Sequence, residues 1–250
     1  MKILCLSDLH LSQNVEVYRV RDQVNSIDEE YDAVIISGDV FESRFLHSHS
    51  PYKQLYKIFG DIPVIFCLGN HEYFYKTVEQ THERMRQAKN VIYSNIVCLD
   101  IANKCVLEDR ILIVGNVLWY DGTLRDYLDQ DLYTFANGCW ADKYIRKFNY
   151  KKEFDKCLKT IETEINNSDE PLKLLVTHTC PHAELNMHKV NPSNFNAFSG
   201  TKNILEFLDV DYSICGHTHR RTIGQVLNET TCINVGNDFH IPLQYFILDI

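Results

Sequence analysis

Residues that can bind metal ions or move protons stand directly after short apolar runs of this sequence. Five runs end in this way, each followed by one or two such residues. The residues are Asp8 and His10, Asp39, Asn70 and His71, His178, and His217 and His219. Carboxylate oxygen, amide oxygen and neutral imidazole together suit divalent ions such as Mn, Fe, Zn, Ni or Co. The set exceeds the needs of one ion, and a shared carboxylate would let it hold two, as in hydrolytic two-metal sites.

The apolar runs before these residues are predicted to be buried strands. They comprise Ile3–Leu6, Ala33–Ile36, Val64–Leu68, Leu172–Thr177 and Tyr212–Cys215. Helical patterns follow the first three runs, with starts at Ser12, at Ser50-Pro51 and at the capping box of Thr77 and Gln80. Strands that alternate with helices predict a parallel sheet, and ligands bind at the carboxyl ends of such strands. We therefore expect the candidate residues to meet at one rim of the sheet.

The remaining segments are less regular. Residues 91–114 hold short apolar stretches between polar turns, which predicts hairpin-connected strands. An apolar face at three- and four-residue spacing predicts a helix over about 150–166, and residues 204–208 are expected to form another. Segments around 222–227, 230–235 and 243–249 predict a closing antiparallel meander. Because there is no repeat and no linker, we expect one domain over residues 1–250, with an aromatic-rich insertion at about 119–150.

Two local patterns bear on how the candidate side chains are placed. Glycines precede Asp39, Asn70 and His217. They predict tight turns out of the strands and close packing around the site. The alternation in Asp8-x-His10 and His217-x-His219 would point both side chains of each pair the same way if the backbone is extended.

The sequence resembles the calcineurin-like metallophosphoesterase superfamily, whose members carry a binuclear metal centre. The resemblance rests on five motifs in a fixed order, namely Asp8-x-His10, Gly38-Asp39, Gly69-Asn70-His71-Glu72, His178 and Gly216-His217-x-His219. The motifs span residues 8 to 219, and their combination is highly specific although each alone would be weak. The resemblance implies an α/β fold, a four-layer αββα sandwich of two mixed β-sheets flanked by helices.

The same resemblance implies a role for each residue. One ion would be held by Asp8, His10, Asp39 and His219, and the other by Asp39, Asn70, His178 and His217, with Asp39 bridging. His71 would face the phosphate as the catalytic residue without binding metal. A metal-bridging hydroxide would attack phosphorus in line, and His71 would stabilise the developing charge or protonate the leaving oxygen. Some members pair this histidine with a nearby Asp; here that offset holds the longer Glu42.

Composition limits the partners. The chain has 25 Lys and Arg against 34 Asp and Glu, a formal charge of -9, so extended nucleic acid is a less expected substrate than a phosphorylated small molecule or nucleotide. No apolar stretch is long enough to span a bilayer, and the N-terminus lacks the pattern of a secretory signal. The nine cysteines are scattered without a repeated C-x-x-C spacing, which predicts reduced thiols in a cytoplasmic setting.

The sequence motifs are also compatible with other functions. A nuclease or a cyclic-nucleotide phosphodiesterase of the same superfamily would carry the same motifs. A non-catalytic scaffold of this fold, like the retromer subunit, should lack His71 or several ligands, and none is missing here. Within the insertion, Arg125, Lys143 or Arg146 could meet phosphate, or the aromatic residues could simply pack against the domain. Of the other histidines, His182 is a candidate to line the pocket; Glu72 is expected to neighbour His71 without binding metal.

Overall fold

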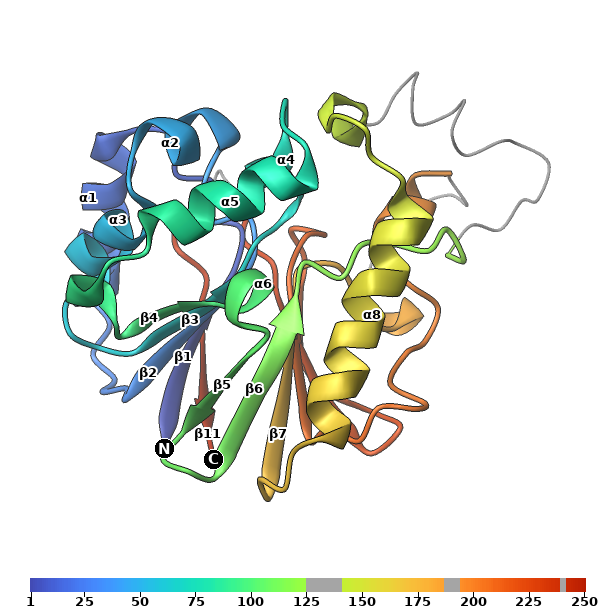
Figure 1. Cartoon of the computed structure of the whole chain (residues 1–250). Coiled ribbons are helices and arrows are strands. Elements are labelled where there is room, and N and C mark those ends of the chain that lie inside the picture. Colours follow the sequence, from blue (N-terminus) through green and yellow to red (C-terminus); the bar gives the residue numbers. More distant parts are fainter. Residues whose placement is uncertain (125–140, 187–193, 239–241) are drawn as a thin grey trace.

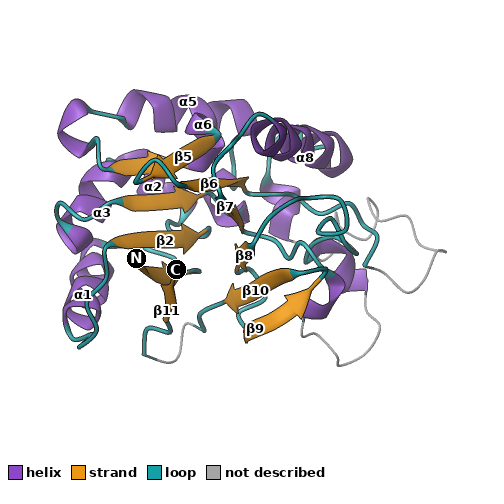
Figure 2. Ribbon diagram, turned by 90° about the horizontal axis from the view of Figure 1, so that it is seen from below, coloured by secondary structure: helices purple, strands orange, loops and turns teal. Residues whose placement is uncertain are grey.

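The computed structural model describes residues 1–124, 141–186, 194–238 and 242–250. Two mixed β-sheets pack face to face, with helices on both outer sides (Figures 1 and 2). This is the αββα sandwich that the motif resemblance implied. The described parts of residues 119–150 follow a strand that ends at Asn116, form a short 3-10 helix and lead into a long helix.

The first sheet has five strands in the order β11-β1-β2-β3-β4. Their bounds are β11 (Phe246–Asp249), β1 (Lys2–Leu6), β2 (Ala33–Ser37), β3 (Val64–Cys67) and β4 (Ile96–Cys98). Strands β1 to β4 are parallel, as the alternating pattern predicted, and β11 pairs antiparallel with β1. The carboxyl ends of β1, β2 and β3 therefore open onto the same edge.

The second sheet has six strands in the order β5-β6-β7-β8-β10-β9. Their bounds are β5 (Lys104–Leu107), β6 (Ile111–Asn116), β7 (Leu172–Thr177), β8 (Tyr212–Cys215), β10 (Thr230–Val235) and β9 (Arg221–Leu227). The inner four strands are parallel, and the two outer strands join by antiparallel pairing. The ends of β7 and β8 thus reach the same edge as those of the first sheet.

Helices form the two outer layers. The longer ones are α1 (Asn14–Asn25), α3 (Pro51–Phe59), α5 (Val78–Ala88) and α8 (Tyr150–Asn166). The shorter ones are α2 (Ser43–Ser48), α4 (Asn70–Tyr73), α6 (Leu99–Ala102) and the 3-10 helices η1 (Val91–Tyr93), η2 (Ala141–Tyr144), η3 (Ala183–Leu185) and η4 (Asn194–Phe198). Helices α1, α3 and α5 cover the first sheet and α8 covers the second (Figures 1 and 2).

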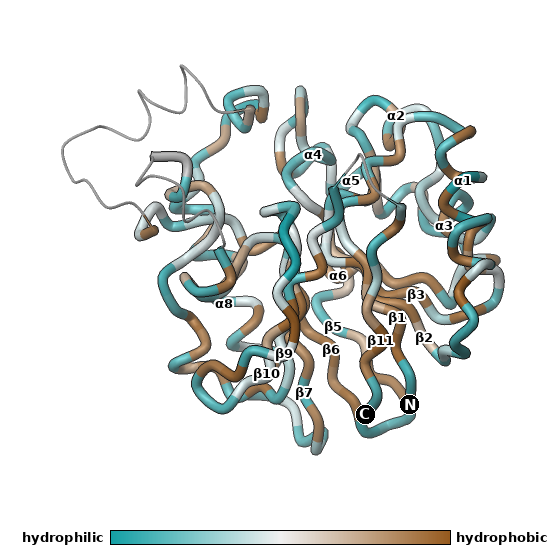
Figure 3. The backbone as a smooth tube through the Cα atoms, turned by 180° about the vertical axis from the view of Figure 1, so that it is seen from behind, coloured by the Kyte–Doolittle hydropathy of each residue, from teal (hydrophilic) through white to brown (hydrophobic). Residues whose placement is uncertain are grey.

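Side-chain alternation along the strands builds two cores. In β1, Ile3 and Cys5 face the opposite sheet, whereas Leu4 and Leu6 pack under the helices. Strands with both faces covered are apolar throughout, which explains the continuous apolar runs of the sequence. Figure 3 shows these strands as the hydrophobic interior, with hydrophilic residues along the outer helices and loops.

Helix starts follow the predicted signals except at α1. Ser50 accepts a hydrogen bond from the Lys53 N–H, and Thr77 and Gln80 form the expected capping box. The cap of α1 is Gln13 rather than Ser12, because Glu16 reaches back to the backbone N–H groups of both residues. The helix begins one residue later than predicted as a result.

Three segment predictions were wrong. Residues 91–101 form η1, the parallel strand β4 and α6 instead of hairpins; only β5 and β6 form one. The C-terminal meander is broken, since β9 and β10 pair with each other but β11 crosses to the first sheet. Residues 204–208 turn without forming a helix, because the Asn203 side chain accepts from the Leu205 N–H and the Ile204 N–H bonds to Pro181.

The eight cysteines within the described ranges carry free thiols, and most are buried; Cys139 lies outside those ranges. Burial raises the pKa of Cys5 to about 12, so this thiol behaves as a small apolar side chain. Among the helices that the structure describes, none combines the length and apolar character needed to cross a membrane.

Candidate metal centre and active site

All eight candidate residues meet at the shared edge of the two sheets. Their ligand atoms fall into three groups, each with atoms within 4.8 Å of one another. The groups are Asp8, His10 and His219; His10, Asp39 and His71; and Asp39, His178 and His217. Asn70 lies beside the third group, since its Oδ1 is 3.1 Å from His178 Nε2. The donors come from the ends of β1, β2, β3, β7 and β8.

Hydrogen bonds to backbone carbonyls fix the tautomers of two histidines. His178 Nδ1 donates to Ser37 O at 2.9 Å, and His217 Nε2 donates to Phe198 O at 3.0 Å. A carbonyl can only accept, so the other ring nitrogens present lone pairs when the rings are neutral. These nitrogens, His178 Nε2 and His217 Nδ1, lie 3.1 Å apart beside Asn70 Oδ1. Three lone pairs that face one another repel unless a proton or a metal ion lies between them, so this group could bind a cation.

The first group is held in the same way. His219 Nδ1 donates to Asn237 O at 2.7 Å, and His10 Nδ1 lies 3.0 Å from Glu42 Oε1. Their Nε2 atoms are thereby turned to the carboxylates of Asp8 and Asp39, at 3.8 and 3.6 Å. Such outer partners set the tautomer and ring orientation of histidines that bind metals. The donor set fits a divalent ion of the borderline class.

Asp39 lies between the groups. Its Oδ2 is 3.4 Å from His178 Nε2, 3.6 Å from His10 Nε2 and 3.8 Å from His71 Nε2. Burial opposes its charge, yet the surrounding histidines hold its pKa well below the usual range. A fully ionised carboxylate that reaches both clusters can bridge two ions.

The pKa shifts of His178 and His217 also indicate a site that favours positive charge. Burial disfavours a charged His178, but the Asp39 carboxylate beside it raises the pKa of His178 to about 10. Burial, and then the charge of His178, lowers the pKa of His217 to about 3. One proton is therefore held between the two rings, where a metal cation would replace it.

The backbone at these residues is not extended, so the condition under which the alternating pairs were expected to point the same way is not met. Asp8, His10, Asp39, His217 and His219 have positive φ angles between 45° and 68°. Left-handed backbone costs free energy for such residues and gathers at functional sites. The alternating pairs still converge, because a repeated left-handed residue turns both side chains toward the same centre.

The predicted close packing at the glycines is observed. A Cβ on Gly69 would lie 2.1 Å from Asp39 Oδ1, and one on Gly216 would lie 1.8 Å from Ser7 Oγ and 2.7 Å from Asp8 Oδ2. Any side chain at these positions would displace a candidate ligand. Gly69 and Gly216 are therefore needed for steric clearance around the candidate ligands.

Two acidic side chains organise the loops around His71. Glu42 Oε1 lies 2.8 Å from His71 Nδ1, so the longer acid makes the pairing that the sequence left open. Burial raises the pKa of Glu42 intrinsically, but its bonds to His10 and His71 lower it to about 2. Glu72 is fully buried and accepts from the N–H groups of Phe41 and Gly69. It braces two strand-end loops and does not belong to any of the three groups of candidate ligands.

A third acid, Asp142 of η2, orients the Asn70 amide. Asn70 Nδ2 donates to Asp142 Oδ1 at 2.8 Å, and the Tyr120 hydroxyl donates to Asp142 Oδ2 at 3.0 Å. This arrangement turns Asn70 Oδ1 toward His178. Sequence reasoning missed Asp142, which lies in a segment without a clear period; no local signal marks it.

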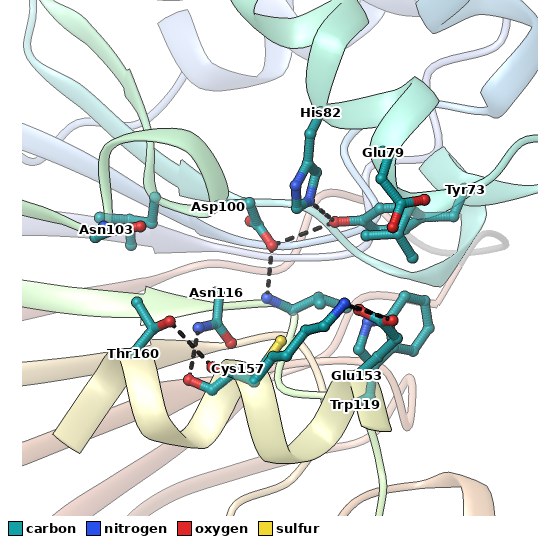
Figure 4. A pocket seen from close by; sticks show the side chains of 14 residues that line it. Tyr73, Glu79, His82, Asp100, Asn103, Asn116, Trp119, Glu153, Cys157 and Thr160 are labelled. Atoms are coloured by element: carbon teal, nitrogen blue, oxygen red, sulfur yellow. Dashed lines mark hydrogen bonds and ion pairs between the residues drawn. The ribbon is translucent and has the colours of Figure 1, made fainter. Parts of the chain in front are cut away.

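A cavity of about 210 Å³ lies behind the loops that carry the candidate residues, between α5, α6 and α8. In Figure 4, Asp100 stands at its wall and joins segments from both sheets. Its carboxylate accepts from Leu68 N–H at 2.7 Å, Val117 N–H at 3.0 Å and Tyr73 hydroxyl at 3.3 Å. Asp100 thus ties the loop that leads to Asn70 to the segment that leads to Tyr120.

The remaining predicted residues take structural places or lie outside the described ranges. His182 Nδ1 accepts from Glu184 N–H at the start of η3, which favours its structural reading. Arg125 lies outside the described residues. Lys143 lies 5.4 Å from the Tyr144 ring, and the Arg146 N–H donates to Lys76 O. The described end of the insertion is thus joined to the loop after His71.

Comparisons with known proteins agree with this architecture. The family model "Calcineurin-like phosphoesterase" matches residues 1–221. Phosphopantetheinyl hydrolase (PptH) from Mycobacterium tuberculosis has a similar fold, with a TM-score of 0.68 and 16% identity over 94% of this chain and 88% of that one. A dimetal phosphatase from Danio rerio also has a similar fold, with a TM-score of 0.53 and 12% identity over 99% of this chain and 91% of that one. At these identities the likeness concerns the fold. No curated protein matches the sequence.

Proposed function

Because the chain belongs to the calcineurin-like phosphoesterase family, we propose that it is a binuclear metal-dependent phosphoesterase acting on phosphomonoesters or phosphodiesters. The observation that carries this proposal is the lone-pair cluster of Asn70, His178 and His217 beside the Asp39 carboxylate. Such a cluster binds cations, and the carboxylate links it to a second set of donors.

Each ion would have its own ligands. One would be bound by Asp8, His10, Asp39 and His219, and the other by Asp39, Asn70, His178 and His217. Bound divalent ions lower the pKa of water and neutralise phosphoryl oxygens, which supplies a nucleophile at neutral pH. Manganese is the ion chosen for the first test, since the donor set suits it as well as Fe, Co, Ni or Zn.

His71 would carry the acid step. Its Nε2 is turned to the donor cluster, 3.8 Å from Asp39 Oδ2, and the side chain is 28% exposed, so substrate can reach it. Burial disfavours the imidazolium, but Asp39 and Glu42 raise the pKa of His71 to about 9. A protonated His71 can neutralise the phosphoryl group and give its proton to the leaving oxygen.

The direct test is phosphoester hydrolysis with controlled metal content. Wild-type protein is stripped with a chelator, reloaded with Mn²⁺ and assayed on p-nitrophenyl phosphate and bis-p-nitrophenyl phosphate. We expect activity only after reloading, with a preference for the diester if the chain is a phosphodiesterase or nuclease. His71→Ala should keep two ions per chain and lose activity by about 10²–10⁴-fold.

The matched metal-site variant is Asp39→Asn. It should lose metal as well as activity, since the bridging charge is removed. Turnover by the chelated wild type, or two tightly bound ions in Asp39→Asn, would contradict the proposal. A Mn²⁺-loaded protein that hydrolyses neither substrate would favour the scaffold alternative.

A further inference from the structure

Two exposed tyrosines stand together beside His71. The Tyr75 and Tyr144 rings are 5.4 Å apart at an interplanar angle of 33°. Each of the two residues is 45% exposed. Among the described residues only Tyr18 and Phe207 are comparably exposed aromatics, and the structure records no ring contact between them. An exposed aromatic pair at the edge of a site is unusual enough to need an explanation.

Phe74 connects this pair to the catalytic histidine. Its ring centroid is 4.6 Å from that of His71 and 6.4 Å from that of Tyr144. Phe74 itself is only 8% exposed, so its buried ring packs against the exposed rings of Tyr75 and Tyr144. The pair therefore lies on the His71 side of the metal centre, where the leaving group of a phosphoester would be.

The backbone holds the two rings in place. Tyr75 has a φ of 66°, which a tyrosine seldom adopts. Its N–H donates to Tyr144 O at 2.8 Å, and the Arg146 N–H donates to Lys76 O at 2.8 Å. Two backbone hydrogen bonds thus join the segment after α4 to the end of η2 and the residues that follow it, and the aromatic side chains are not needed for that junction. Their exposure is better explained by a ligand.

We propose that Tyr75 and Tyr144 form a stacking subsite for an aromatic ring in the leaving group of the substrate, which makes a nucleotide the preferred substrate class. This inference rests on the proposed function. Every nucleobase has a π-face, and stacking on aromatic side chains contributes about 1–3 kcal/mol per base. Burial of a base here would place the phosphoester beside His71 and the metal centre.

The test compares substrates that differ only in the base. Wild-type protein with Mn²⁺ is given AMP and ribose 5-phosphate, each also as its methyl diester, and products are measured by ion chromatography. We expect a kcat/KM at least about 5-fold higher for the base-containing member of a hydrolysed pair. Tyr144→Leu should lower that value roughly 5- to 100-fold, mainly through KM, and leave the base-free substrate unchanged.

Two further variants guard against a misfolded protein. Tyr144→Phe retains the ring and should behave as wild type, and Tyr75→Leu removes the other ring. Equal rates on both members of each pair in the wild type would overturn the subsite while the phosphoesterase function stands. An equal loss on both members in Tyr144→Leu would also overturn it, because that result indicates a structural role. Failure to hydrolyse any substrate would instead contradict the proposed function.

Discussion

Glu42 Oε1 lies 2.8 Å from His71 Nδ1, and the same oxygen lies 3.0 Å from His10 Nδ1. One carboxylate oxygen therefore orients both a proposed metal ligand and the proposed catalytic acid. The two rings meet edge to face with their centroids 4.5 Å apart. A change at Glu42 should consequently affect both metal binding and the acid step.

Replacement of Glu42 by alanine should reduce kcat by about 10- to 100-fold, the usual effect of losing an outer partner of a metal-site histidine. Glu42→Gln should cost less, because its amide oxygen can still accept from both rings although the charge is gone. Steady-state kinetics with Mn²⁺ and metal analysis would measure the two effects. Wild-type kcat in Glu42→Ala would show that the shared oxygen has no role in catalysis.

Asp142 gives a second prediction, which concerns metal affinity. Removal of the carboxylate in Asp142→Ala frees the Asn70 amide to rotate, and we expect Mn²⁺ to bind about 10- to 100-fold more weakly. Asp142→Asn should stay within a few-fold of wild type, since its oxygen can accept from Asn70 while its NH₂ donates to the Tyr120 hydroxyl oxygen. Isothermal titration with Mn²⁺ distinguishes these outcomes. Equal Mn²⁺ affinities of the Asp142→Ala and Asp142→Asn variants would show that Asp142 does not orient the Asn70 amide.

The candidate ligands were predictable because each follows a strand that the sequence marks clearly. Strands such as Ala33–Ser37 are buried on both faces and stand out as apolar runs, so the polar residue after each run is conspicuous. Parallel strand order then brings these ends to one edge. The same reasoning cannot find Asp142, which reaches Asn70 across 72 positions through a segment without a period.

Other features depended on geometry that a pattern does not contain. The sequence could not decide whether Glu42 reaches His71, because that depends on the left-handed turn at Asp39. It also left the backbone conformation at Asp8 and His10 open, where both φ angles are positive. Strand β11 was expected beside β10, but its pairing with β1 is a long-range choice between two sheets.

Asp100 gives a prediction about stability. Its carboxylate accepts from two backbone N–H groups and the Tyr73 hydroxyl, whereas Asn offers only one oxygen and turns an NH₂ toward a donor. Asp100→Asn should lower the free energy of unfolding by about 1–3 kcal/mol. Urea denaturation of the metal-free protein measures this change. The control is Asp22→Asn, at a side chain that is 66% exposed, and it should change stability by less than about 0.5 kcal/mol.

His82 gives a prediction about pH. Burial, and then the nearby Arg86, lowers the pKa of His82 in the folded protein to about 4 from the usual 6.5. Between these values the unfolded chain binds a proton that the folded chain does not, so stability should be full above pH 6.5 and fall as the pH drops toward 4. The predicted loss is about 2–3 kcal/mol.

The measurement for His82 is the free energy of unfolding from urea denaturation at pH 7.5 and pH 4.5, in chelator, for wild type and His82→Gln. Carboxylates titrate over the same range in both proteins. The difference between the two proteins in how the free energy of unfolding changes with pH therefore isolates the contribution of the histidine. Gln keeps a hydrogen-bonding group for the Tyr73 hydroxyl, which His82 Nε2 contacts at 2.9 Å, but cannot gain charge. We expect the variant to lose less stability than wild type on acidification, and parallel slopes would rule out the depressed pKa.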